Sequence, residues 1–153
     1  MMRRVAACLA FAGFILAAPM PGASAQGARS TADGVFSEAQ AKAGETAYQS
    51  HCAGCHGLDL KKTDAEAPDL TEGPFRYGWQ GKTVGERFEK IRTTMPKAPL
   101  PKLTDQLYVD IIAYILSFNG VAAGSEAMPA DAPKLDVITI ELPPEKSGGG
   151  RRR

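Results

Sequence analysis

The run Cys52-Ala53-Gly54-Cys55-His56 decides how the rest of this 153-residue chain is interpreted. Its two thiols are separated by about one helical turn, and an imidazole follows directly. The C-x-x-C-H spacing is typical of covalent haem attachment, in which two thiols add to the vinyl groups along one edge of the macrocycle. Small residues between the cysteines let the ring approach the backbone. The run therefore predicts one covalent haem c, held by Cys52 and Cys55, with His56 as an iron ligand.

Other chemistries also use cysteines at this spacing. A structural zinc site needs four Cys or His ligands, and beyond residue 25 only His51 accompanies the three residues of the motif, within a cramped run of six. A thioredoxin-like redox pair follows a strand in an α/β pattern, and no such alternation is visible here. The zinc and thioredoxin readings are therefore disfavoured, whereas a plain structural disulfide stays open.

An iron with one histidine ligand has an open axial position, which methionine sulfur can fill. Met95 lies 39 residues after His56, in a Thr-Thr-Met-Pro segment where the proline favours an extended backbone. A thioether ligand raises the reduction potential and suits electron transfer. Filling a gap in the core is the alternative role for a methionine, and we expect it for Met128. His51, beside the motif, is expected at the surface.

Ser37 marks the start of a helix on the N-terminal side of the motif. With Gln40 three residues later it forms a possible capping box, and alanines at helical spacing continue to about Ser50. This helix leads directly into Cys52. From residue 57 to 81, prolines and glycines interrupt a polar sequence, which predicts mostly loop.

Two further helices are predicted after this loop. Thr83 and Glu86 form a second capping box, for a short helix that Met95-Pro96 ends. Thr104 caps the most regular helix of the chain, whose apolar residues recur at helical spacing over residues 107–118. Together these segments predict an all-α domain.

The two ends of the chain carry different signals. Residues 1–25 combine a basic start, an apolar run of 14 residues and a small-x-small site, which predicts a signal peptide cleaved after Ala25 and a periplasmic product. The apolar run is shorter than the roughly 20 residues of a spanning helix, so no stable membrane anchor is expected. Residues 26–35 are expected to form a loose leader, and residues 121–153 an extended surface segment with a basic tail.

With its haem motif, Met-Pro loop and final amphipathic helix, the segment 36–120 resembles the small single-haem c-type cytochromes with His/Met ligation. The resemblance implies a class I cytochrome c-like fold, an all-α domain in which the N- and C-terminal helices cross over a covalently bound haem. Gly44 and Tyr48 match the positions where the first helix crosses the last, near Tyr114. A glycine there allows close approach of the two backbones.

The same resemblance implies two further contacts with the cofactor. Pro68 matches the proline whose carbonyl accepts a hydrogen bond from the haem histidine and so fixes its tautomer. Trp79 matches a partner of the haem propionates, although a tryptophan at this position can also be a core aromatic. The candidate cofactor-binding residues are therefore Cys52, Cys55, His56, Met95, Pro68 and Trp79, of which His56 and Met95 would bind the iron.

A narrower similarity suggests the redox partners. Residues 79–85, 113–116 and 141–143 look like those of cytochromes associated with quinoprotein (pyrroloquinoline quinone) dehydrogenases, which pass electrons from the dehydrogenase to a terminal oxidase. Between Arg76 and Lys102 seven basic residues accompany two acidic ones, a local charge of +5. Such a surface can steer an acidic partner, or it can be a solvated face without one.

We therefore expect a periplasmic electron carrier with no catalytic residues, whose partner is a dehydrogenase, a terminal oxidase or another cytochrome. A further alternative is that it is held as the cytochrome subunit of a dehydrogenase. Loss of residues 1–25 leaves 16 basic and 17 acidic residues, so the charge predicts no nucleic-acid binding. The alternative function is a haem enzyme or sensor, such as a small peroxidase or gas-binding protein, which requires a displaceable sixth ligand.

Overall fold

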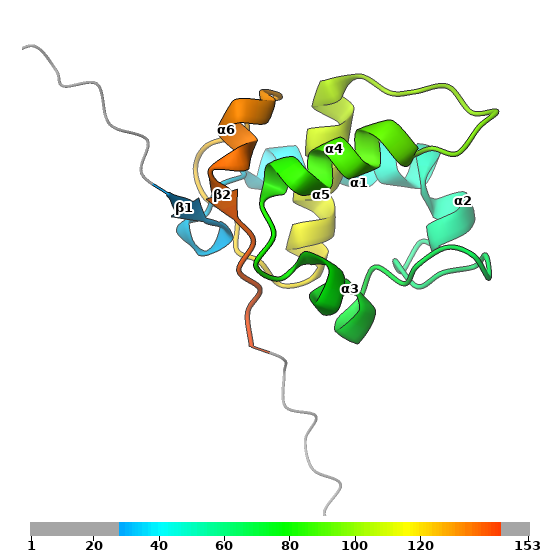
Figure 1. The fold of residues 1–153 in the computed structure, drawn as a ribbon, viewed down its shortest axis with the longest axis horizontal. Coiled ribbons are helices and arrows are strands. Elements are labelled where there is room, and N and C mark those ends of the chain that lie inside the picture. Colours follow the sequence, from blue (N-terminus) through cyan, green and yellow to red (C-terminus); the bar gives the residue numbers. More distant parts are fainter. Residues whose placement is uncertain (1–27, 145–153) are drawn as a thin grey trace, which may run out of the picture.

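The computed structural model describes residues 28–144, and most of the regular structure in them is helical. In chain order the elements are β1 (Arg29–Ser30), the 3-10 helix η1 (Thr31–Asp33), α1 (Glu38–His51), α2 (Ala53–His56), α3 (Glu72–Trp79), α4 (Val84–Thr94), α5 (Asp105–Phe118), α6 (Ala132–Asp136) and β2 (Ile138–Thr139). β1 and β2 pair in parallel, which adds a two-stranded sheet to the expected all-α domain. α2 lies at one end of the molecule, and the sheet with α6 lies at the other (Figure 1).

Two expectations concern residues outside this range. The predicted signal peptide and the basic tail after residue 144 lie beyond the described residues. Within residues 28–144, no helix is both long and apolar enough to cross a membrane.

The predicted capping residues begin three of the helices. Each hydroxyl accepts a hydrogen bond from the backbone N–H three residues later, at 3.2 Å for Ser37, 3.0 Å for Thr83 and 3.4 Å for Thr104. These bonds satisfy N–H groups that have no partner within the first helical turn. At Thr83 the box is complete, because its own N–H donates to Glu86 at 2.8 Å. At Ser37 it is incomplete, because the Gln40 side chain contacts Asp110 instead.

α1 and α5 form the centre of the domain. Gly44 of α1 lies against the backbone carbonyl of Asp110 in α5, where no side chain would fit between the two helices. One turn further along each helix, the rings of Tyr48 and Tyr114 have centroids 5.3 Å apart. The contact between these helices that the resemblance implies is therefore present, and it depends on the absence of a Cβ at position 44.

The segment between residues 57 and 81 is mostly irregular, as expected, but it also contains the helix α3, Glu72–Trp79, which the sequence did not indicate. Pro74 is the third residue of this helix, where its missing N–H would have had no partner within the helix. Phe75 and Trp79, one turn apart, are both buried, and their rings have centroids 4.8 Å apart. This packing, and not local propensity, explains a helix in a segment with glycines and a proline.

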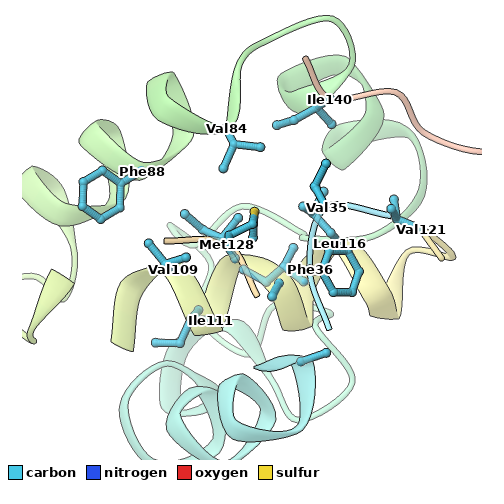
Figure 2. Packing of buried hydrophobic residues seen from close by; sticks show 14 of the residues in the cluster. Val35, Phe36, Val84, Phe88, Val109, Ile111, Leu116, Val121, Met128 and Ile140 are labelled. Atoms are coloured by element: carbon cyan, nitrogen blue, oxygen red, sulfur yellow. The ribbon is translucent and has the colours of Figure 1, made fainter. Parts of the chain in front are cut away.

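The segments on either side of residues 36–120 contribute to the core, which corrects the expectation of a loose leader and a surface segment. Thr31 and Val35 are buried, and so are four apolar residues of the C-terminal region, each at most 3% exposed: Met128, Leu135, Ile138 and Ile140. Figure 2 shows Met128 among Phe36, Val84 and Val109. Ile138 and Ile140 belong to a short alternating run that ends at Leu142, which the sequence alone places on the surface, whereas Met128 lies in a segment without a regular period. Tertiary packing therefore determines that these side chains are buried.

A buried amide fixes part of this C-terminal region to the two central helices. Gln40 Nε2 donates to Asp110 Oδ1 and to the Met128 carbonyl, both at 3.0 Å. Its Oε1 accepts from the Met128 N–H at 2.8 Å. Both ends of the Gln40 amide therefore have partners, and the backbone of Met128 is held against α1 and α5.

Candidate functional site

The end of α1 positions the first cysteine of the motif. The Cys52 N–H donates to the Tyr48 carbonyl at 2.8 Å, and Cys52 then leaves the helical conformation with φ −123° and ψ −33°. The chain turns there into α2, where the N–H groups of Cys55 and His56 donate to the Cys52 carbonyl at 3.2 and 3.0 Å. This turn brings two thiols and an imidazole together.

The two thiols differ in exposure. Cys52 is half-buried and Cys55 is exposed, and both are free, so they do not form the structural disulfide that the sequence left open. Burial, together with the nearby Cys55, raises the pKa of the Cys52 thiol to about 11. Cys52 is therefore a neutral thiol near pH 7. Within residues 28–144, no group of three or more His, Cys, Asp and Glu side chains could hold a metal ion, such as zinc.

His56 is oriented by the loop that follows it. Its Nδ1 lies 3.1 Å from the carbonyl oxygen of Pro68. A carbonyl oxygen can only accept, so this contact requires the proton on Nδ1. The Nε2 lone pair is then available to a metal ion, and the hydrogen bond makes the imidazole a more basic ligand.

A cavity of about 370 Å³ lies beside α2. All six residues predicted to contact a cofactor line it, namely Cys52, Cys55, His56, Pro68, Trp79 and Met95. Much of the remaining wall is apolar and includes Leu70, Ile91, Ile111 and Ile115. The volume lies within the range of small-molecule and cofactor sites, about 300–1,000 Å³. The fold thus collects in one place the residues that the sequence analysis selected from separate segments.

Met95 reaches this cavity from the segment that joins α4 to α5, which we term the Met95 loop (residues 95–104). Its N–H donates to the Ile91 carbonyl at 2.7 Å, and its backbone is extended at φ −124° and ψ 152°, as expected before a proline. Met128 is 1% exposed in the core and does not line the cavity. His51 is exposed and also lines the cavity. Met95 and His51 therefore both line the cavity, whereas Met128 does not.

Trp79 is a core aromatic, and its contact with a haem propionate stays a prediction. It is 7% exposed and packs on Phe75, and it also lines the cavity.

α4 presents one face to the cavity. Arg87, Lys90, Ile91 and Thr94 line it, at the spacing of residues that share a helix face. The Nε atom of Arg87 is buried and has no hydrogen-bond partner. The same is true of Arg92 Nε, but only Arg87 also lines the cavity, where its positive charge suits an anionic group. From the sequence alone, Arg87 is one of seven basic residues between positions 76 and 102. Its helical spacing with Ile91 is the signal that could distinguish it from the others.

The basic residues between positions 76 and 102 do not all surround the cavity. Three line it, and the other four contact different parts of the chain: Arg76, Lys82, Arg92 and Lys102. Asp64 and Glu66 also line the cavity, and Lys97 lies 3.4 Å from Glu66. The local positive charge at the cavity is therefore smaller than the sequence count of +5 indicates.

Residues 39–115 match the protein family described as cytochrome c oxidase, cbb3-type, subunit III. The chain belongs to this family. Like other members of the cbb3-type subunit III family, it contains a c-type cytochrome domain, whose cofactor is haem c.

A curated relative of this subunit III domain is the "Cbb3-type cytochrome c oxidase subunit CcoP" of Rhodobacter capsulatus, which is 30% identical over 91 residues. The alignment covers 54% of this chain and 31% of the relative, so the chain spans about a third of that protein's length. No solved structure shows a significant match.

The residues that line the cavity of this cytochrome domain have the chemical groups that a covalently bound haem requires. Two free thiols and an imidazole with an available Nε2 lie on α2 and at its start. A thioether is supplied by Met95, and the guanidinium of Arg87 supplies a positive charge that suits a propionate. The apolar residues of α5 provide the remaining contact surface for a macrocycle.

Proposed function

We propose that this chain is an electron carrier that binds one haem through thioether bonds to Cys52 and Cys55, with His56 and Met95 as the axial ligands. A c-type cytochrome domain carries electrons as its ordinary function. One observation supports the proposed attachment and ligation: both cysteines of the motif, His56 and Met95 line a single cavity. A haem enzyme or sensor would need a readily displaced sixth ligand.

Each of these residues has a defined task. When bound, the haem supplies the one-electron couple of its iron. His56 is held as the Nδ1–H tautomer by Pro68, so that its Nε2 faces a metal ion with a fixed orientation. Met95 supplies a thioether, which favours reduced iron and raises the potential. Arg87 would supply positive charge to a propionate within the cavity, and the apolar walls would limit the access of water to a bound haem.

The proposed location and partners rest on the sequence. The signal peptide predicted in residues 1–25 supports export to the periplasm. The similarity to quinoprotein-associated cytochromes supports a dehydrogenase as the electron donor, and the relative named as an oxidase subunit supports a terminal oxidase as the acceptor. Lys90 and the exposed Leu100 line the cavity, as does Lys97, which pairs with Glu66. They provide a modestly basic and apolar contact surface for an acidic redox partner.

A redox titration of the purified holoprotein tests this function. We expect a reversible one-electron transition, and an absorption spectrum of the oxidised protein that is unchanged by cyanide or peroxide at concentrations that saturate five-coordinate haem. Rapid spectral change with these ligands, with peroxide turnover, would support the enzyme or sensor alternative. Electron transfer to an acidic redox protein should slow as the salt concentration rises, because exposed charges are screened.

A further inference from the structure

The Met95 loop is held by a lysine from its own far end. Lys102 Nζ donates to the carbonyl oxygens of Thr93 at 3.1 Å, Met95 at 3.1 Å and Pro96 at 3.2 Å. A lysine ammonium has three N–H donors, so all of them have an acceptor here. The Thr93 carbonyl lies in the last turn of α4, where carbonyl groups lack helical partners and a cation is favoured by the helix dipole.

A tyrosine of α5 holds the same backbone group from the interior. Tyr108 Oη donates to the Met95 carbonyl at 2.8 Å, and it accepts from the Leu103 N–H at 3.1 Å. Tyr108 is 1% exposed, so its hydroxyl lies where a lost hydrogen bond is not readily replaced by water. Its two bonds connect the beginning of the Met95 loop to its end.

The two residues act on one atom. The Met95 carbonyl oxygen accepts from both Tyr108 and Lys102, which uses both of its lone pairs. The Met95 N–H is bonded to the Ile91 carbonyl at 2.7 Å. Both polar groups of the Met95 backbone are therefore fixed, while its side chain lines the cavity.

We propose that Lys102 and Tyr108 are positioning residues that hold the Met95 thioether in place as a ligand, and that their contacts set how easily the thioether is displaced. This inference rests on the proposed function, since it requires Met95 to bind the haem iron. Neither residue lines the cavity itself, so each would act on the ligand through the backbone of the Met95 loop.

The test compares four variants of the holoprotein. Lys102→Met removes the ammonium and keeps the aliphatic stem, Tyr108→Phe removes only the hydroxyl, and Lys102→Arg keeps the positive charge. The control is Lys134→Met, which removes one exposed lysine that pairs with Asp131 at 3.2 Å, remote from the Met95 loop. The readouts are the far-red charge-transfer band of the oxidised protein, which reports the thioether–iron bond, and the dissociation constant of added imidazole.

Lys102→Met and Tyr108→Phe should each weaken the far-red band and bind imidazole about tenfold more tightly. Each variant lacks one hydrogen bond to the Met95 carbonyl, so less free energy is needed to move the Met95 thioether away from the iron. Lys102→Arg should restore part of the parent behaviour, and Lys134→Met should match the parent. Circular dichroism confirms that each variant is folded. Because Lys102 is exposed, its replacement should not disturb the core even if Tyr108→Phe does.

The experiment distinguishes a failure of the positioning role from a failure of the proposed axial ligation. If the parent shows the far-red band and both Lys102→Met and Tyr108→Phe retain the parent's imidazole affinity, the positioning role is wrong and the proposed function stands. If the parent binds haem without the band, Met95 is not the ligand, and the axial part of the proposed function fails together with this inference.

Discussion

Gly44 of α1 and Asp110 of α5 meet backbone to backbone, and a Cβ at position 44 would overlap the Asp110 carbonyl oxygen. The contact matters for the site because α1 leads directly to Cys52, while α5 supplies Ile111 and Ile115 to the cavity wall. The separation of the two helices therefore determines how far the thiols lie from the opposite wall.

Gly44→Ala should destabilise the protein by about 2–3 kcal/mol, because the added methyl group must push α1 away from α5. Urea unfolding followed by circular dichroism measures this change. The matched control is Gly78→Ala in α3, where an added Cβ meets nothing within 4 Å. That substitution should be neutral or slightly stabilising, since alanine favours a helix over glycine by about 0.5–1 kcal/mol. Equal unfolding midpoints for the two variants would contradict the proposed contact.

Met95→Ala and Met128→Ala should separate a ligand from a core residue. Met95→Ala should abolish the far-red band, lower the potential and raise imidazole affinity, by about tenfold for each 1.4 kcal/mol of thioether–iron bonding that is lost. Met128→Ala should keep the band and lose about 2–5 kcal/mol of stability, because it leaves a cavity in the core. Optical titration with imidazole and urea unfolding provide the two measurements. An unchanged spectrum in Met95→Ala would show that Met95 is not an axial ligand, and it would support the enzyme or sensor alternative.

Arg87→Leu should lower the reduction potential, because a cation beside the haem favours the reduced and less positive state. A tenfold shift of that equilibrium corresponds to about 59 mV for one electron. Arg92→Leu is the control on the same helix, since Arg92 pairs with Glu89 at 2.8 Å and does not line the cavity. Spectroelectrochemistry of both variants gives the comparison, and a larger shift in Arg92→Leu would argue against a propionate at Arg87.

The C-terminal region should be part of the cooperative folding unit. Ile140→Ala should cost about 2–5 kcal/mol, because this side chain is fully buried and its backbone is bonded to Gly81 and Lys82. Val137→Ala, at a side chain that is 39% exposed, should cost roughly 0.5 kcal/mol. Chemical denaturation measures both variants. If Ile140→Ala has no effect, residues after 120 are an appendage to the domain, as the sequence alone indicated.

The sequence was informative where a signal is local. The capping residues Ser37, Thr83 and Thr104 each act within one turn of their own helix, so their residue types predict three helix starts. The thiol spacing and the Met-Pro pair are local in the same way, and the segments that carry them line one cavity.

Features that depend on distant packing were not predictable. α3 contains Pro74 and two glycines, and only the burial of Phe75 and Trp79 against the rest of the chain explains it. Gln40 was assigned to a cap, but its amide binds Asp110 and Met128, up to 88 positions away. The roles of Arg87 and Lys102 could not be separated from those of other basic residues, since charge alone does not reveal which side chain enters a cavity and which contacts the backbone.

The most direct test of the account is whether haem remains bound to the unfolded chain. The protein is produced in a host that attaches haem to exported cytochromes, denatured in acidified acetone, digested and analysed by mass spectrometry. We predict one haem per chain, retained on the peptide that contains Cys52 and Cys55, and a c-type absorption band in alkaline pyridine. Haem that extracts completely into the solvent, or a chain that never acquires haem, would contradict the proposed covalent site.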